Sequence, residues 1–107
     1  MSVKPFQAKP GGSITVANGT SASAAASLDE GCETVGLTNT SATAIAYFRC
    51  DSVVTDAQAV PAVTVATGLP ILPMNQIRVT VGLGKKRFTA IASAADGNLI
   101  ITPGQGD

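Results

Sequence analysis

Histidine and tryptophan are absent from this chain of 107 residues, and the remaining aromatic side chains are one tyrosine and three phenylalanines. Without histidine the chain lacks the commonest general base and the commonest metal ligand. With so few aromatic rings it cannot build a platform on which nucleobases or sugars stack. We therefore expect a protein that is not an enzyme and that has no catalytic residues, no metal site and no cofactor.

Charge is scarce as well. Charged residues make up 13% of the chain, and seven Lys and Arg balance seven Asp and Glu. A net charge near zero argues against binding to nucleic acid and suits a protein that packs densely into an assembly. No apolar run approaches the roughly 20 residues of a membrane-spanning helix, so we expect no membrane contact. The first ten residues do not resemble a signal peptide, which predicts synthesis in the cytoplasm without export.

The remaining composition is that of a folded domain with a thin core. Hydrophobic residues make up 45% of the chain, but most are the small side chains of Ala and Val, which gain little burial energy each. Such a domain gains stability by associating with partners or with copies of itself. Residues 1–12 include Pro5, Pro10, Gly11 and Gly12 and are predicted to form an extended arm. Residues 13–107 are predicted to form a single β-sandwich domain.

Short runs of alternating apolar and polar residues, separated by Gly, Asn and Pro, follow the arm. They predict an all-β protein, either an antiparallel β-sandwich or a jelly-roll-like barrel of about seven or eight short strands with an extended N-terminal arm. The clearest unit is a hairpin in which Thr34–Thr38 and Thr43–Arg49 flank a turn at Asn39–Ser41. The other expected strands are Ser13–Ala17, a short run that includes Val63 and Val65, Gln76–Val81, Arg87–Ala92 and Leu99–Thr102.

Three segments are harder to assign. Ser21–Leu28 is rich in alanine, which favours helix, but the turn residues on either side of it favour a strand. Gly68–Pro73 contains too much proline for a central strand and is expected to be a loop or an edge. Pro103–Asp107 is expected to be a Gly-rich tail.

The more apolar face of each expected strand predicts the core. Because side chains alternate between the two faces of a strand, a shift of one residue would exchange core and surface. The predicted core residues are Ile14, Val16, Val35, Leu37, Ile45, Tyr47, Val63, Val65, Ile77, Val79, Phe88, Ala90, Leu99 and Ile101.

Asp29, Glu30 and Glu33 form the one acidic cluster of the sequence. Two close carboxylates occur in glycosidases, and several occur in calcium sites. Charged clusters at turns are usually exposed, however, and nothing near this cluster supplies a substrate platform. We therefore interpret it as a solvated turn between strands.

The basic cluster is Lys85, Lys86 and Arg87, which follows a glycine-containing segment, Gly82–Gly84. A phosphate-binding loop would need a helix after it, whereas a strand is expected here, so we interpret the glycines as a hairpin turn with positive φ angles. The three cations have two interpretations. They contact an acidic partner surface, or they keep an exposed hairpin tip soluble.

Two cysteines, Cys32 and Cys50, are present. A disulfide between them would require that they face each other on adjacent strands. In a protein made in the cytoplasm the expected state is two reduced, half-buried thiols.

The runs Glu33–Arg49 (ETVGLTNTSATAIAYFR) and Leu99–Gly106 (LIITPGQG) resemble segments of small structural proteins of tailed bacteriophage virions. In those proteins a Pro-rich connection like Leu69–Pro73 leads into a strand like Gln76–Val81. The resemblance implies a capsid decoration or cement protein, synthesised in the host cytoplasm and located on the capsid surface of the virion. Such a protein binds the outside of an assembled capsid and bridges major capsid subunits, often as a symmetric dimer or trimer.

Two other functions stay open at this point. One is a different virion part, such as a head–tail connector, tail or fibre-base component. The other is a stand-alone β-sandwich binding module of lectin or adhesin type. The residues expected to contact a partner belong to the arm, which can add a strand to a partner sheet, and to the basic cluster. They are Lys4, Pro5, Phe6, Lys9, Lys85, Lys86 and Arg87.

Overall fold

The computed structural model describes residues 7–8, 13–28, 31–55 and 57–105. These residues contain strands and turns but no helix, and every strand pairing among them is antiparallel. The strands are β1 (Gln7–Ala8), β2 (Ile14–Ala17), β3 (Ala26–Leu28), β4 (Thr34–Asn39), β5 (Ala46–Ser52), β6 (Leu69–Ile71), β7 (Gln76–Thr80), β8 (Lys86–Ala92) and β9 (Asn98–Gln105).

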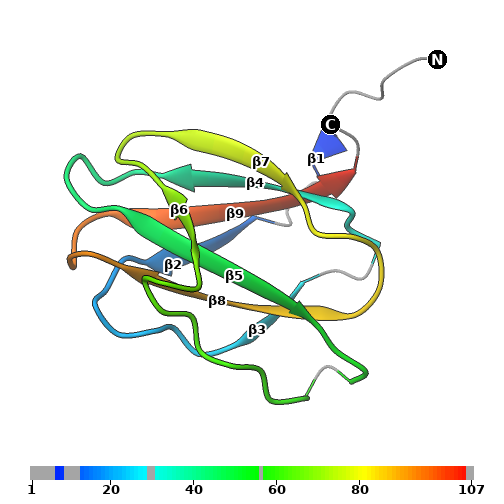
Figure 1. Ribbon diagram of the computed structural model, residues 1–107. Helices are drawn as coiled ribbons and strands as arrows, with labels where there is room; N and C mark the ends of the chain where they lie inside the picture. Colours follow the sequence, from blue (N-terminus) through cyan, green and yellow to red (C-terminus); the bar gives the residue numbers. More distant parts are fainter. Residues whose placement is uncertain (1–6, 9–12, 29–30, 56, 106–107) are drawn as a thin grey trace.

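The strands form two sheets (Figure 1). Sheet A has the order β2-β9-β4-β7, with β1 paired to the far end of β9, and sheet B has the order β3-β8-β5-β6. Within these sheets β5 pairs with β6, β4 with β7, β3 with β8, and β2 with β9. This nested pairing is that of one long hairpin rolled up around a core, which is the jelly-roll arrangement. The predicted fold class is therefore confirmed.

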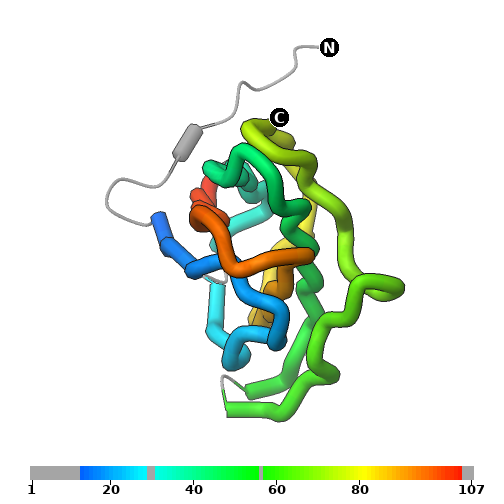
Figure 2. The backbone as a smooth tube through the Cα atoms, turned by 90° about the vertical axis from the view of Figure 1, so that its left-hand side faces the viewer, coloured from blue at the N-terminus to red at the C-terminus, as the bar shows by residue number. Residues whose placement is uncertain are grey.

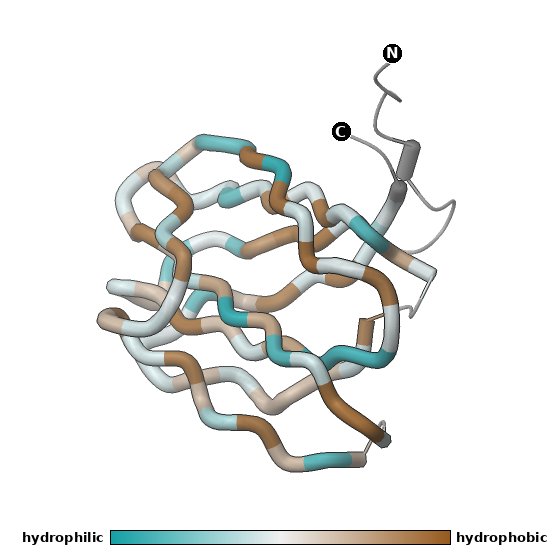
Figure 3. Tube along the Cα trace, turned by 45° about the vertical axis from the view of Figure 1, so that its right-hand side comes forward, coloured by the Kyte–Doolittle hydropathy of each residue, from teal (hydrophilic) through white to brown (hydrophobic). Residues whose placement is uncertain are grey.

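The core lies between the two sheets and is made from alternate residues of each strand. Val35 and Leu37 of β4 and Ile101 of β9 are fully buried there. Phe48 and Phe88 supply the largest apolar surfaces, and their rings stack with centroids 5.6 Å apart. Figure 3 shows the resulting alternation of hydrophobic and hydrophilic positions along the tube. The predicted core residues found buried or packed against the core are Ile14, Val16, Val35, Leu37, Val63, Ile77, Val79, Phe88, Ala90, Leu99 and Ile101.

The predicted hairpin around Asn39–Ser41 is wrong. Its first strand, β4, pairs with β7 and β9 in sheet A, whereas its second strand, β5, pairs with β6 and β8 in sheet B. The intervening residues form a corner that carries the chain from one sheet to the other. Local alternation and a turn signal are the same for a hairpin and for a corner, so the sequence pattern did not distinguish them.

The core face of β5 was also predicted backwards. Ala46 and Phe48 point into the core, while Ile45 and Tyr47 are only half-buried and lie on the other face of the strand. The physical reason is that the outer face of sheet B is itself covered, so that it too carries large apolar side chains. Val65, which was predicted in the core, is 56% exposed.

The cover of sheet B is the long connection 53–68 between β5 and β6. In Figure 2 this part of the tube (green) runs along one flank of the molecule. Val63 of this connection is buried, and its backbone N–H donates to Thr89 Oγ1 of β8 at 3.0 Å. Gly68 lies so close to Tyr47 that a Cβ atom added there would be 2.6 Å from the tyrosine Cβ, which explains the glycine. The connection thus encloses a small second apolar layer.

Three further segments differ from expectation. The segment around Gly82 and Gly84 connects β7 of sheet A to β8 of sheet B and is not a hairpin turn, although both glycines have the expected positive φ, 82° and 101°. The expected tail begins as strand, because β9 continues to Gln105 and pairs with β4 and β1. Of the ambiguous segment Ser21–Leu28, only Ala26–Leu28 is a strand.

One buried amide holds the corner between β4 and β5. The Asn39 side chain is 1% exposed, and its Nδ2 donates to the carbonyls of Ala44 at 2.8 Å and Ile71 at 3.0 Å. Its Oδ1 accepts from Asn18 Nδ2 at 3.1 Å and from the Ser41 N–H at 3.0 Å. A single side chain therefore joins three connections, those between β2 and β3, β4 and β5, and β6 and β7.

The fourth connection at this end, between β8 and β9, is attached through Asp96. Its Oδ2 accepts from Ser41 Oγ at 2.5 Å and from Thr43 Oγ1 at 3.2 Å, and its carbonyl accepts from Asn18 Nδ2 at 2.8 Å. Gly97 then passes against Ser41 with a φ of 72°, where a Cβ atom would be 2.6 Å from the Ser41 nitrogen. We call this end of the molecule the Asn39 end.

We predict that Asn39→Ala lowers the free energy of unfolding by about 2–4 kcal/mol, because it leaves several buried donors and acceptors without partners. Asn75→Ala is the matched control. The Asn75 side chain is exposed and accepts one hydrogen bond, from the Gln76 N–H, so this change should cost about 1 kcal/mol or less. Urea unfolding of both variants measures the difference, and equal costs would contradict the role assigned to Asn39.

Candidate functional site

The residues expected to contact a partner belong to two segments, and we begin with the arm. Lys4, Pro5, Phe6 and Lys9 lie outside the described residues. The arm is described at β1, where Gln7 is opposite Gln105 and Ala8 is opposite Gly104. Part of the predicted arm therefore adds a strand to sheet A of its own chain, at the end of β9 that extends beyond β2.

The second segment lies at the same end of the molecule as β1. The Glu33 N–H donates to the Gly104 carbonyl at 3.1 Å, and the Val81 N–H donates to the Glu33 carbonyl at 2.8 Å. The Val53 N–H donates to the Lys85 carbonyl at 3.0 Å. The β3–β4, β5–β6 and β7–β8 connections and β1 thus gather at one end, which is the right-hand side of Figure 1. We call it the arm end.

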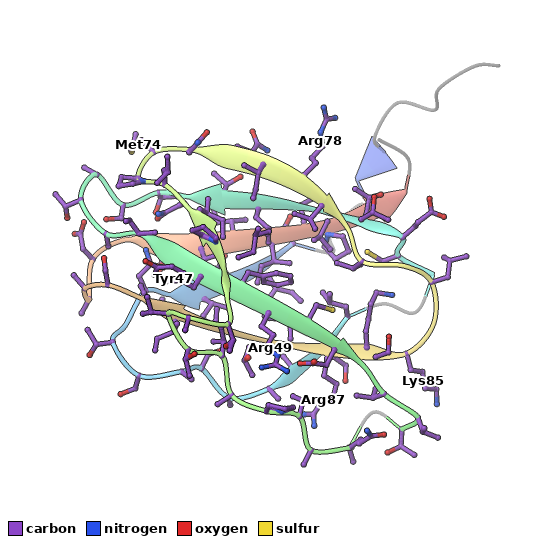
Figure 4. The ribbon with its side chains drawn as sticks, viewed as in Figure 1. Tyr47, Arg49, Met74, Arg78, Lys85 and Arg87 are labelled. Carbon is purple, nitrogen blue, oxygen red and sulfur yellow. The ribbon has the colours of Figure 1, made fainter. Side chains whose placement is uncertain are left out.

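Lys85 is exposed at the arm end, beside two exposed apolar side chains. Figure 4 shows it pointing away from the ribbon at the connection between β7 and β8. Leu83 on the same connection is 67% exposed, and Val54 on the facing connection is 81% exposed. A cation flanked by apolar side chains fits a partner surface that combines an acidic group with an apolar one.

Lys86 does not belong to this surface, contrary to the prediction. It is 2% exposed and lies on the core face of β8, in alternation with Phe88 and Ala90. Its Nζ donates to the Gly84 carbonyl at 2.9 Å. The period of two along a strand puts neighbouring cations on opposite faces, which explains why consecutive lysines differ so strongly in exposure.

Arg87 is on the outer face of sheet B, but both terminal nitrogens of its guanidinium are paired within the chain. Nη1 donates to the Gln58 carbonyl at 2.7 Å, and Nη2 donates to the Ala25 carbonyl at 3.0 Å. The side chain thereby fastens the 53–68 connection and the segment before β3 onto β8. Of the three consecutive cations, Lys85 alone is therefore left as an exposed candidate contact.

Carboxylates do not assemble into a site among the described residues. Glu33 is exposed, and Asp29 and Glu30 lie outside those residues. Asp51 pairs with Arg49, with Oδ2 3.1 Å from Nε. No group of three or more metal-ligating side chains occurs in the described part of the chain. No helix described there is long and apolar enough to cross a membrane.

Both cysteines are free thiols. Cys32 is buried, and its Sγ donates to the Thr34 carbonyl at 3.1 Å. Cys50 lies on the core face of β5 and is partly buried, which raises its pKa from 9.0 to about 11 because burial disfavours the charged thiolate. The neighbouring Lys86 opposes this shift, since its positive charge favours the thiolate.

A second candidate surface was missed by the sequence analysis. Leu69, Leu72 and Met74, on β6 and the turn after it, are 38%, 55% and 73% exposed. The signal that could have found them is the absence of any charged residue between Asp56 and Arg78, which is the longest uncharged stretch of the sequence. Charge depletion of this kind marks the centres of protein interfaces.

Comparison of the chain with protein-family models, with curated proteins and with solved structures finds no match.

We predict that Cys50 in the folded protein reacts with iodoacetamide at pH 8 about 100-fold more slowly than in denaturant, because the thiolate is the nucleophile and the pKa is raised from 9.0 to about 11. The folded state also holds this proton more tightly than the unfolded chain. The contribution of the protonated Cys50 thiol to the stability of the folded state is thus full below pH 9.0 and is lost as the pH rises toward about 11. Mass spectrometry of the alkylated protein, with Cys50→Ser as the control for Cys32, measures the rate. Rapid labelling of Cys50 at pH 8 would contradict the burial described above.

Proposed function

We propose that this protein is a capsid decoration or cement protein of a tailed bacteriophage, which binds the outside of the assembled capsid and bridges major capsid subunits. Copies of the protein associate with one another on the virion. The proposal has no catalytic step and no cofactor, and its partner is the major capsid protein.

Two considerations support the proposal. The first is the resemblance of Glu33–Arg49 and Leu99–Gly106 to segments of small virion proteins. The second is the jelly-roll arrangement, which viral capsid proteins use, although lectins and cupins use it too. The second consideration is an analogy at the level of the fold, so the weight of the argument falls on the surface.

The observation that carries the proposal is the gathering of contact segments at the arm end. β1 pairs there with Gly104 and Gln105, and the exposed Lys85, Leu83 and Val54 lie on two adjoining connections. A protein that joins two neighbouring subunits needs at least two separate contacts directed to one side. The combined binding of such contacts depends on the spacing of the subunits, so it favours the assembled lattice over isolated subunits.

The lectin alternative is less well supported by the described aromatic residues. Phe48 and Phe88 stack against each other in the core, and Tyr47 lies against Gly68 under the long connection. These rings are used in packing rather than presented to a ligand. A tail or connector role uses the same kind of surface, and it is distinguished by the location of the protein on the particle.

We predict that the protein binds assembled particles at least tenfold more tightly than isolated capsid subunits, because contact with several subunits multiplies the affinity. Binding only the assembled state also stabilises that state. Particles are stripped of the protein, then decorated again, and their resistance to heat and osmotic shock is compared. Equal resistance of stripped and decorated particles, or micrographs that locate the protein only at the tail, would refute the cement role.

Lys85→Glu tests the surface itself. We expect it to weaken binding to particles at least tenfold. The change replaces the positive charge of Lys85, which is exposed at the arm end, with a negative one, and so turns attraction to an acidic group of the partner into repulsion. Thr20→Glu, a change of an exposed residue on the connection that follows β2, is the control and should bind as the unchanged protein does. Equal binding by both variants would exclude the arm end as the contact.

A further inference from the structure

Asn18 and Gly19 form the one Asn-Gly pair of the sequence. In such a pair the backbone nitrogen of the glycine attacks Cγ of the asparagine, because glycine has no Cβ atom that hinders the approach. A bond forms between the Gly19 nitrogen and Asn18 Cγ as the bond between Cγ and Nδ2 breaks, and the proton of the Gly19 N–H leaves with the amide nitrogen as ammonia. Water then opens the cyclic imide at either carbonyl carbon, which gives aspartate or isoaspartate. The pair is therefore a site at which deamidation needs water but no enzyme.

The folded chain holds the Asn18 amide against this reaction. Asn18 is 9% exposed, and its Nδ2 donates to Asn39 Oδ1 at 3.1 Å and to the Asp96 carbonyl at 2.8 Å. The backbone is fixed on both sides of the pair. The Asn18 N–H donates to the Gly97 carbonyl at 3.0 Å, and the Gly19 carbonyl accepts from a backbone N–H of β8 at 2.8 Å. The imide therefore forms only after several of these hydrogen bonds have opened.

The residues that hold the amide come from distant parts of the chain. Asn39 is the last residue of β4, whereas Asp96 and Gly97 belong to the connection between β8 and β9. Figure 1 shows this connection beside the end of β2, at the left of the molecule. A chain in which β9 has not paired with β2 lacks two of the three hydrogen bonds that Asn18 donates. Full protection of the amide therefore requires the closed roll.

The fold does not require a glycine at position 19. A Cβ atom added to Gly19 would have no described atom within 4 Å, and Gly19 is not among the glycines with positive φ. Gly97 on the facing connection differs in both respects, since its φ is 72° and an added Cβ atom would be 2.6 Å from the Ser41 nitrogen. The side chain at position 19 can therefore be changed to alter the chemistry of Asn18 without disturbing the packing.

Both products of deamidation are unfavourable in the folded chain. Aspartate has no N–H to donate, so its carboxylate would face two acceptors, Asn39 Oδ1 and the Asp96 carbonyl, at a buried position. Isoaspartate would also insert a methylene group into the backbone after Asn18, and so displace the Gly19 carbonyl from its partner on β8. Loss of the amide therefore opposes closure of the roll.

We propose that Asn18 is a protected deamidation site: chains whose roll stays open lose the Asn18 amide, and its loss then prevents the roll from closing. A chain that remains open is thereby removed irreversibly from the pool that folds, whereas a closed chain keeps the amide. This inference goes beyond the proposed function and is independent of it, because it concerns the isolated chain. Its test uses the full-length protein alone.

The protein is held at pH 8 with a thiol reductant, either folded or in guanidinium chloride, and peptide mass spectrometry follows the conversion of Asn18. We expect conversion to be at least tenfold slower in the folded protein, because it must wait for local opening. Samples diluted from denaturant at successive times should lose their ability to refold in proportion to the converted Asn18.

Gly19→Ala is the matched variant. The added Cβ atom hinders the attack on Cγ, so conversion in denaturant should be at least tenfold slower and the refolding yield should persist. The melting temperature should be unchanged or slightly higher, because the site has room for the methyl group and alanine restricts the unfolded chain.

Asn18→Asp supplies one product directly, and we expect it to lower the melting temperature by about 10 °C or more, or to prevent folding. Asn75→Asp is its control. The Asn75 side chain is exposed and accepts from the Gln76 N–H, and an aspartate keeps that acceptor, so the melting temperature should be unchanged.

Three results would overturn the inference. One is equal conversion of Asn18 in the folded and the denatured protein, since the roll would then protect nothing. Another is converted protein that refolds as well as unconverted protein, or Asn18→Asp protein with an unchanged melting temperature. The third is a Gly19→Ala protein that loses its refolding yield as fast as the unchanged protein does, which would assign the loss to a different chemical change.

Discussion

The jelly roll depends on hydrogen bonds to the backbone N–H and carbonyl groups at the corner where the chain leaves sheet A for sheet B. A corner of this kind interrupts both hydrogen-bond ladders, and it buries Ser41 and Ala44, whose backbone groups need partners. The side chain of Asn39 supplies these hydrogen bonds. Its amide nitrogen donates to backbone carbonyls and its amide oxygen accepts from a backbone N–H, as a backbone peptide group would. Asp96 performs the same task for the connection that closes the roll.

The two ends of the molecule differ in their hydrogen bonds and in the side chains that they expose. The Asn39 end is a closed network of amides, hydroxyls and one carboxylate, and it presents the rigid turn that carries Met74. The arm end has exposed connections, an exposed lysine and the short β1 strand.

How much of this was predictable from the sequence can be judged strand by strand. The all-β class and most of the core followed from alternation, because β2, β4, β7, β8 and β9 each show it clearly. Pairing did not follow, because a turn signal such as Asn39–Ser41 is compatible with a hairpin and with a corner between sheets. The error in β5 had a similar origin: Tyr47 is the bulkier residue, but the 53–68 connection covers it from outside, and nothing in the local sequence reveals that cover.

For the candidate contacts, alternation alone would have assigned Lys85 and Lys86 to opposite environments, whereas the internal partners of Arg87 come from distant segments.

The position of β9 also determines how the chain must fold. β9 is central in sheet A, where it pairs with β2 and β1 on one side and β4 on the other, yet along the chain it comes after all the other described strands. Until it appears, β2 and β4 lack the strand that lies between them, and only the inner pairs of the nested hairpin, beginning with β5 and β6, can form. Closure of the domain therefore waits for pairings between residues nearly the whole chain length apart, as between Ala17 and Asn98, which is a slow step because a long loop must close first. During that interval the edges of sheet A are open to other chains, and β2, with Ile14 and Val16 on its core face, is an edge that stays adhesive until β9 covers it.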